Sequence, residues 1–344
     1  MPRPTVQHRP WLSRLPAVDP YIAALLGTVV LASVLPATGT GAVAAGHAST
    51  GAVALLFFLY GARMSTRDAL DGVRHWRLHL LVLASTFVAF PLLGLLLRPA
   101  TGWAVGPQLA TGLLFLCLLP STVQSSIAFT SIARGNVAAA VCAGSFSNLL
   151  GVVLTPLLSA ALLGTGGGGL SLGSLLSIAL QLLVPFAAGQ ALRRWIGDWI
   201  ARNRRVLGLV DRGSILLVVY TAFSEGVAGG IWHQAPLPRL GALLLIEALL
   251  LATVLTLTMT VSRRLGFGRE DLIAIVFAGS KKSLASGVPM ATVLFPAATV
   301  GLMVLPLMLF HQMQLMVCAA LARRWAGDAG PRPSVPQREL ARTT

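Results

Sequence analysis

The stretch FAGSKKSLASGVP, Phe277 to Pro289, places two adjacent lysines among small, apolar and hydroxylated residues. Lys281 and Lys282 are the only lysines in a chain with 26 lysines and arginines, so the other twenty-four basic residues are arginines. An ionised lysine in apolar surroundings is costly and therefore needs a compensating partner. The stretch predicts a polar site inside an otherwise apolar environment.

The composition of the whole chain indicates a membrane protein. The chain is 55% hydrophobic and 11% charged, whereas an ordinary soluble domain is about a quarter charged. Apolar runs of roughly twenty residues, long enough to cross a bilayer core of about 30 Å, recur almost to the C-terminus. We therefore expect an all-α polytopic membrane protein and exclude a soluble enzyme with one anchor.

Turn residues and charges divide the chain into ten candidate transmembrane helices. Their predicted ranges are Tyr21 to Leu35, Ala42 to Tyr60, Leu78 to Leu97, Gln108 to Ala133, Val137 to Leu163, Leu172 to Leu192, Ser214 to Ile231, Leu240 to Val261, Leu272 to Leu294 and Ala298 to Ala320.

The arginines predict the orientation of these ten spans. If the N-terminus is cytoplasmic, twenty-two of the twenty-four arginines lie on the cytoplasmic side, and only Arg98 and Arg239 lie opposite. Basic residues near helix ends are retained in the cytoplasm, so we predict a multi-pass protein of the cell membrane with both termini cytoplasmic. The net charge of +15 belongs to this topology, and no nucleic acid is expected as a partner because no basic, aromatic-studded surface accompanies it.

The fourth and ninth spans contain helix-breaking residues. Span four carries Pro120 followed by a run of small and hydroxylated residues, and span nine carries Gly279, Gly287 and Pro289 around the lysines. Unwound backbone at membrane depth must be enclosed by protein or face water. The pattern predicts discontinuous helices four and nine and an internal polar site.

The positions of the two broken helices predict an internal repeat. Each is the fourth of five spans, and because five is odd the two halves have opposite orientations, as in secondary transporters whose sites lie at mid-membrane. The predicted segments are a cytoplasmic tail at 1–18, a first five-helix repeat at 19–163, a glycine-rich linker at 164–171, a second five-helix repeat at 172–322 and a cytoplasmic tail at 323–344.

Two long motifs carry a resemblance to a known family. The segment LPSTVQSSIAFTSIARGNVAAAV followed by LTPLL, and the later segment FAGSKKSLASGVPMATVLF, resemble the bile acid/sodium symporter family, solute carrier family 10, and within it the branch around member 7. The resemblance implies a panel domain of spans one, two, six and seven, and a core domain of the other six. It also implies that spans four and nine cross at mid-membrane beside the bound ions.

This chain departs from the ion-binding pattern of that family. Sodium-coupled relatives carry a Ser-Asn pair in span four, and a Glu followed four residues later by a Gln in span nine. The pair here is Ser125 and Ser126, the Glu position holds Ala278, and the Gln position holds Lys282. These departures argue against sodium coupling, and no cofactor or metal is expected.

The lysines suggest that an ammonium group attached to the chain takes the place of the Na⁺ ion that sodium-coupled relatives bind. The hydroxyl and amide oxygens of span four would then accept hydrogen bonds from an ammonium, which has three donors. The amine could load and unload a proton in place of Na⁺, or hold a fixed charge that attracts an anionic substrate. The expected site residues are Lys281, Lys282, Ser280, Ser283, Ser121, Thr122, Gln124, Ser125, Ser126 and Glu225.

Two acidic residues are candidates to pair with the lysines. We expect Glu225 to be a lysine partner or a cavity residue, and Glu247 to lie near a helix end and reach the interface. We expect one lysine to be functional and the other structural. The alternatives are that both are functional or that neither is, and a lysine without a function would extend its ammonium to the membrane interface. Asn148 and Gln314 are expected to join helices by hydrogen bonds.

These observations predict a secondary transporter, not an enzyme, that moves a small organic anion by alternating access. One alternative is an intramembrane hydrolase with Ser280 or Ser283 as nucleophile and Lys281 or Lys282 as base. Another is a regulatory membrane protein that influences ion entry. The lipid bilayer is the expected partner, and the sequence leaves the oligomeric state, the solute and the coupling ion open.

Overall fold

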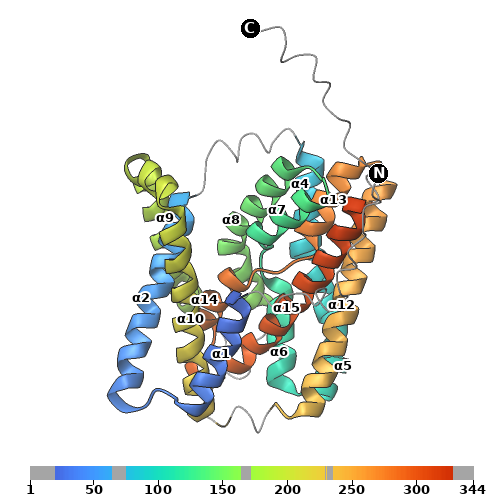
Figure 1. Cartoon of the computed structure of the whole chain (residues 1–344). Coiled ribbons are helices and arrows are strands. Elements are labelled where there is room, and N and C mark those ends of the chain that lie inside the picture. The colour runs from blue at the N-terminus through green and yellow to red at the C-terminus, as the bar shows by residue number, and fades with distance from the viewer. Residues whose placement is uncertain (1–19, 64–74, 164–171, 229, 231–234, 328–344) are drawn as a thin grey trace, which may run out of the picture.

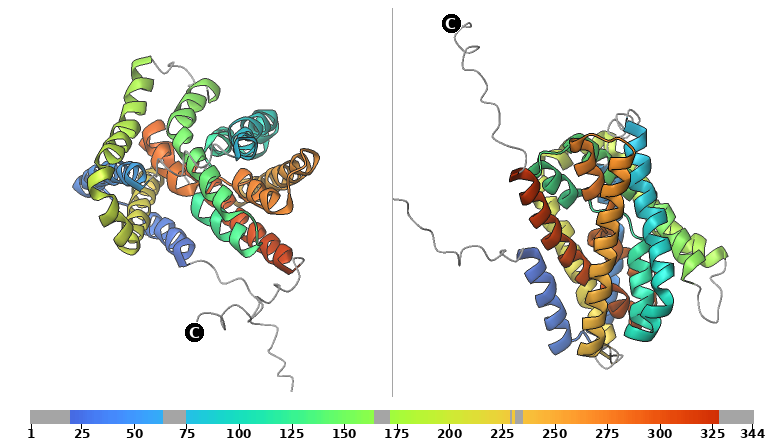
Figure 2. Two further views of the ribbon diagram at one scale, coloured as in Figure 1. Left: turned by 90° about the horizontal axis from the view of Figure 1, so that it is seen from above. Right: turned by 90° about the vertical axis from the view of Figure 1, so that its right-hand side faces the viewer.

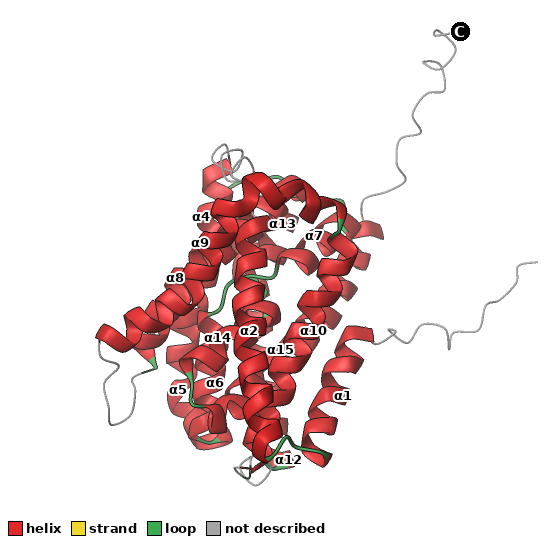
Figure 3. Cartoon of the chain, turned by 90° about the vertical axis from the view of Figure 1, so that its left-hand side faces the viewer, coloured by secondary structure: helices red, strands yellow, loops and turns green. Residues whose placement is uncertain are grey.

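The computed structural model describes residues 20–63, 75–163, 172–228, 230 and 235–327. Within these ranges every regular element is a helix and none is a strand, as Figure 3 shows, which confirms the all-α class. The tail at 1–18, the linker at 164–171 and most of the tail at 323–344 lie outside the described residues.

The helices follow one another with few long connections. In the first half they are α1 (Pro20–Val34), α2 (Gly39–Arg63), α4 (Trp76–Ala84), the π-helix η3 (Ser85–Ala89), α5 (Phe90–Val105), α6 (Pro107–Leu118), α7 (Val123–Ile132) and α8 (Val137–Leu162). In the second half they are α9 (Leu172–Arg202), α10 (Arg204–Ala228), α12 (Leu237–Arg264), α13 (Arg269–Gly279), α14 (Leu284–Leu294) and α15 (Ala297–Gly327). The last helix therefore continues beyond the boundary predicted at residue 322.

Six helices of the described part are long and apolar enough to cross a bilayer, and the bent pair α6–α7 brings the number to seven. The protein is therefore a multi-pass membrane protein. Three of the ten predicted spans are outside this number. α1 has 15 residues, and α13 and α14, the two parts of predicted span nine, have 11 each, whereas a span needs about 20. The third is α9, which has 31 residues and is long enough, but it is not among the helices that meet both criteria. The ten-span count stays a prediction.

The helices gather into two groups. Figures 1 and 2 show α1, α2, α9 and α10 on one side of the molecule, and α4, α5, α12 and α13 on the other. Within the first group, α2 and α9 touch backbone to backbone. A Cβ atom on Gly61 would lie 2.0 Å from the Phe186 carbonyl oxygen, and one on Gly189 would lie 2.0 Å from the Phe58 carbonyl oxygen, so only glycine fits at either position.

Polar contacts link the end of α2 to α14 and to α10. The Tyr60 hydroxyl, near the end of α2, donates to the Ala285 carbonyl of α14 at 3.1 Å. One turn further along α2, Arg63 forms an ion pair with Asp211 of α10. The end of α2 is therefore held both to the start of α14 and to the first part of α10.

Both predicted helix interruptions are present. α6 ends at Leu118 and α7 begins at Val123, with a bend of 64° between them, because Pro120 has no N–H to continue the helix. α13 ends at Gly279 and α14 begins at Leu284, where the Ser283 hydroxyl accepts from the Ser286 N–H and caps the new helix.

Candidate functional site

The two interruptions lie in direct contact. The Ser283 N–H donates to the Pro120 carbonyl at 2.9 Å, and the Thr122 hydroxyl donates to the Lys282 carbonyl at 2.9 Å. Each bond joins backbone or hydroxyl groups from one break to the other. The unwound residues therefore satisfy one another, as enclosed non-helical backbone must.

The C-terminal end of α13 is capped by four hydroxyl groups. The last four carbonyls of a helix have no partner within it, and here each accepts from a serine. The donor–acceptor pairs are Ser280 with Val276, Ser126 with Phe277, Ser121 with Ala278, and Ser85 with Gly279.

The C-terminal end of α6 is capped by an ammonium group instead. Lys282 is fully buried, and its Nζ donates to the carbonyls of Cys117 and Leu119 at 2.9 and 2.7 Å. Its third donor goes to the Thr86 carbonyl in the π-helix η3 at 2.9 Å. A cation is favoured at a helix C-terminus, where the dipole is negative, and the Phe90 ring lies 4.1 Å from Nζ. The ammonium therefore has every donor satisfied.

The backbone of Lys282 is held from α15. The Gln314 amide accepts from the Lys282 N–H at 2.8 Å and donates to the Lys282 carbonyl at 2.9 Å. Asn148 of α8 makes a similar bridge, because it donates to the Ser121 carbonyl and accepts from the Ser286 hydroxyl, both at 2.8 Å. These contacts confirm the expectation that Asn148 and Gln314 join helices by hydrogen bonds.

Lys281 lies in a different environment. Its side chain is also fully buried, but its Nζ donates to one hydroxyl, that of Ser125, at 3.2 Å. The Phe129 and Phe277 ring centroids lie 4.3 and 5.6 Å from Nζ. Among the described residues this ammonium therefore has one hydrogen bond and two aromatic contacts. Because both lysines are enclosed by protein, exposure at an interface does not explain either.

The oxygens predicted to surround the amine are used in several ways. Only Ser125 accepts from a lysine Nζ. Ser121, Thr122 and Ser126 donate to carbonyls across the crossing, and Gln124 is exposed on α7. Backbone carbonyls of α6 and η3 take the place expected for span-four side chains.

The serines considered as nucleophiles have structural bonds. The Ser280 hydroxyl donates to the Val276 carbonyl at 2.6 Å, and the Ser283 hydroxyl caps α14. Within the described ranges, the lysine–serine hydrogen bond is the one between Lys281 and Ser125. The geometry does not favour the hydrolase alternative with Ser280 or Ser283 as nucleophile, because that chemistry requires nucleophile and base in contact.

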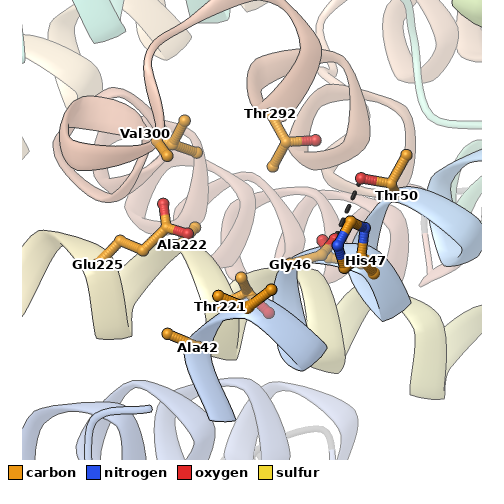
Figure 4. A pocket seen from close by; sticks show the side chains of 12 residues that line it. Ala42, Gly46, His47, Thr50, Thr221, Ala222, Glu225, Thr292 and Val300 are labelled. Carbon is orange, nitrogen blue, oxygen red and sulfur yellow. Dashed lines mark hydrogen bonds between the residues drawn. The ribbon is translucent and has the colours of Figure 1, made fainter. Parts of the chain in front are cut away.

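A cavity of about 450 Å³ separates α2 and α10 from the junction of α14 and α15. Figure 4 shows the Glu225 side chain among its walls, with His47 and three threonines. Glu225 therefore lines this cavity, and neither lysine belongs to its lining. The lining residues are Ala42, Val43, Gly46, His47, Ser49, Thr50, Thr221, Ala222, Glu225, Thr292, Ala297 and Val300.

Glu247 of α12 is fully buried, so the expectation that it reaches an interface is wrong. It lies ten residues into a 28-residue helix, too far from either end to extend to it. Neither carboxyl oxygen has a hydrogen-bond partner among the described residues. A buried carboxyl without a partner is destabilising.

Sequence reasoning missed the acceptors of Lys282 and most of the cavity. The acceptors are backbone carbonyls, which every residue type carries, so no letter in the sequence marks them. The cavity residues Thr50, Thr221 and Thr292 are scattered over three helices. One signal was available: α6 ends two residues before Pro120, and a helix end inside the membrane leaves carbonyls that need donors.

Comparison with known proteins identifies relatives along almost the whole chain. The family model described as the SBF-like CPA transporter family matches residues 19–327. The chain is 60% identical over 309 residues to "Uncharacterized protein PA2026" of Pseudomonas aeruginosa, with 90% of this chain and 93% of the relative covered.

Two further relatives have names that describe transport. The chain is 52% identical over 308 residues to "Putative symporter YfeH" of Escherichia coli, with 90% of this chain and 93% of the relative covered. It is 29% identical over 273 residues to "Sodium/bile acid cotransporter 7" of Rattus norvegicus, with coverage of 78% and 80%.

Proposed function

Because this chain belongs to the SBF-like CPA transporter family, we propose that it is a secondary active transporter that moves a small organic solute across the cell membrane by alternating access. The observation that carries the proposal is the contact between two interrupted helices with a buried ammonium at their junction. Discontinuous helices that meet inside the membrane form the ion and substrate sites of secondary transporters.

The architecture proposed for this function has ten spans in two inverted five-helix repeats. The interruptions of α6–α7 and α13–α14 belong to the fourth span of each repeat. On this view α1, α2, α9 and α10 form the panel, and the remaining helices form the core that contains the crossing. The grouping of helices in Figures 1 and 2 supports this division.

We propose that Lys282 replaces a diffusible cation. Three carbonyl oxygens lie within 2.9 Å of its Nζ, as they would around a bound cation. Carbonyls of unwound backbone and of helix C-termini are the groups that coordinate Na⁺ in secondary transporters with discontinuous helices. Sodium coupling is therefore not expected. Lys281 has a single hydrogen bond, so it is the better candidate to take up and release a proton as coupling ion.

The arginine distribution suggests which side the cavity faces. It places the start of α2 and the end of α10 outside, and both termini in the cytoplasm. The cavity lies between these helix ends, whereas the Tyr60–Ala285 hydrogen bond joins the opposite end of α2 to the start of α14 at the crossing. This combination supports an outward-facing state in which the cytoplasmic side is closed between α2 and α14.

The structure does not favour the alternatives. A regulatory protein that influences ion entry needs neither a buried ammonium nor a solute-sized cavity beside an interrupted helix. The lysines were the reason to expect an anionic solute, but both are enclosed and lie outside the cavity wall. The charge of the solute is therefore better inferred from the cavity itself.

The transport proposal is tested by uptake into proteoliposomes. We would compare wild type, Lys281→Ala and Lys282→Ala with radiolabelled benzamidine, putrescine, benzoate, succinate and the bile acid taurocholate, under an imposed Na⁺ or pH gradient. Wild type should accumulate at least one solute when a pH gradient is imposed, and a Na⁺ gradient should make no difference. Empty liposomes measure passive entry.

Two results would contradict the proposal. Equal entry into empty and protein-containing liposomes for every solute and both gradients would exclude transport of this size class. A Na⁺ dependence retained in both lysine variants would exclude the idea that an ammonium has replaced sodium, while leaving transport itself intact.

A further inference from the structure

The cavity has an unbalanced charge. With His47 neutral, Glu225 is the single charged residue among the twelve that line the cavity. These twelve include no lysine and no arginine. The carboxylate of Glu225 has no ion-pair partner among the described residues, whose ion pair joins two other residues, Arg63 and Asp211. A cavity with apolar walls and one sign of charge attracts the opposite sign.

The hydroxyl groups of the cavity are oriented as acceptors. A threonine hydroxyl has one proton and two lone pairs, and each lining threonine donates its proton to a carbonyl of its own helix. Thr50 donates to Gly46 at 3.1 Å and Thr292 to the Pro289 carbonyl at 2.8 Å. Thr221 donates to the Leu217 carbonyl at 3.0 Å. The lone pairs of these hydroxyls remain for a ligand with N–H or O–H donors.

The helix ends near the cavity do not reverse this polarity. The ends of α10 and α14 each add about half a negative charge, and the starts of α2 and α15 each add about half a positive charge. These four contributions are opposite in pairs and similar in size, so the full charge of the Glu225 carboxylate decides the sign. Among the lining side chains, His47 and Ser49 are the remaining groups able to donate a hydrogen bond.

We infer that the cavity binds the cationic, N–H-bearing group of an organic solute, an amine, amidine or guanidine, with Glu225 as its counter-ion and the threonine hydroxyls as acceptors. This inference rests on the proposed transport function for its biological meaning, and it replaces the anionic solute predicted from the lysines. The apolar part of the solute lies against Ala222, which comes from α10 like Glu225, and against Val300 of α15; Figure 4 shows both near the Glu225 side chain.

The test uses three probes of one shape and different charge. Benzamidine is cationic, benzamide neutral and benzoate anionic, and the two nitrogens of the amidine correspond to the two oxygens of the carboxylate. Binding to purified full-length protein in detergent is measured by calorimetry and by the shift in thermal unfolding. Affinity should fall from benzamidine to benzamide to benzoate, by about tenfold for the first step, because a charge-assisted bidentate hydrogen bond is lost.

The variants separate the carboxylate from general effects of charge. Glu225→Gln should weaken benzamidine by about tenfold and leave benzamide unchanged. Glu270→Gln removes the same charge from an exposed residue of α13 and should change neither. Glu225→Asp keeps the charge and should keep the order of the three probes, which preserves the test if Glu225→Gln does not fold. Thr292→Val should weaken benzamidine by a few-fold because an acceptor is lost.

The outcomes separate this inference from the transport proposal. Benzoate binding as tightly as benzamidine, no binding of any probe to wild type, or unchanged benzamidine affinity in Glu225→Gln would overturn the inference. Benzamidine bound through Glu225 without uptake of any solute would support the cavity assignment and contradict transport. Uptake of a carboxylate with no amidine binding would support transport and overturn the inference.

Discussion

Two adjacent lysines occupy two different kinds of site. Lys282 has three carbonyl acceptors within 2.9 Å, at the end of α6 and in η3, whereas Lys281 has one hydroxyl at 3.2 Å and two aromatic rings. Both are equally buried. Burial alone therefore does not decide what a membrane lysine does, because the acceptors around the ammonium differ.

The difference assigns different roles to the two lysines. An ammonium with all three donors satisfied closes a helix end and fixes the crossing, as a bound ion would. An ammonium with one acceptor is stabilised less in its charged form, so it can respond to a change of conformation or of proton concentration. We therefore expect Lys282 to act chiefly on folding and Lys281 chiefly on transport.

The largest expected effect is the loss of the Lys282 ammonium. Lys282→Met keeps an unbranched side chain that is one atom shorter, and it leaves the carbonyls of Thr86, Cys117 and Leu119 without their donor. We expect a loss of about 3–5 kcal/mol of stability, because each buried acceptor left unsatisfied costs about 1–3 kcal/mol. The melting temperature in detergent and the monodisperse yield on size-exclusion chromatography measure it.

A matched test of the same site uses added cations. If Lys282 takes the place of an ion, Lys282→Ala should leave a space that Na⁺ or Li⁺ can enter. A sodium or lithium salt should then raise the melting temperature of Lys282→Ala more than it raises the melting temperature of Lys281→Ala. An unchanged melting temperature for Lys282→Met would mean that the three carbonyls find other donors, and the contrast between the lysines would fail.

A smaller effect on stability is expected for Lys281. Lys281→Met removes one hydrogen bond to Ser125 and the contact with Phe129, so we expect a loss of about 1–2 kcal/mol. The pH dependence of uptake should nevertheless disappear, because the amine proposed to carry the proton is gone. Uptake with wild-type pH dependence in this variant would assign the proton to another group.

The smallest effect is expected at Glu247, a buried ionisable group with no hydrogen-bond partner among the described residues. Glu247→Leu replaces an unsatisfied carboxyl by an apolar side chain of similar size, so stability should be unchanged or rise by about 1 kcal/mol. Thermal unfolding measures it, with Glu247→Gln as the polar control. A clear loss of stability in the leucine variant would show that the carboxyl has a stabilising role after all.

Much of the fold could be predicted from the sequence because bilayers limit the choices. Apolar runs of helix length predict an all-helical membrane protein, and Pro120 and Gly279 mark two helix ends where the structure has them. The number of spans is harder to predict, because elements such as α1, α13 and α14 are too short to cross by themselves. The sequence also gives no sign that α9 continues to Arg202 as one helix.

The candidate site was predictable in its location but not in its contacts. The rarity of lysine singled out Lys281 and Lys282, and Ser125 was among the expected acceptors. The partners of Lys282 are main-chain oxygens brought together by helix packing and by the π-helix η3, and this arrangement has no residue signature. Glu225 was expected as a lysine partner or as a cavity residue, but the direction of the threonine hydroxyls around it depends on backbone geometry.

The glycine contacts between α2 and α9 have a mechanical consequence. Gly61 and Gly189 let the two backbones touch, and interlocked surfaces of this kind resist sliding because every shift brings a larger neighbour against the partner backbone. We expect α2 and α9 to move together as one rigid body. The bending needed to expose the cavity to the opposite side of the membrane must then occur in the connections at the ends of these helices, not within them.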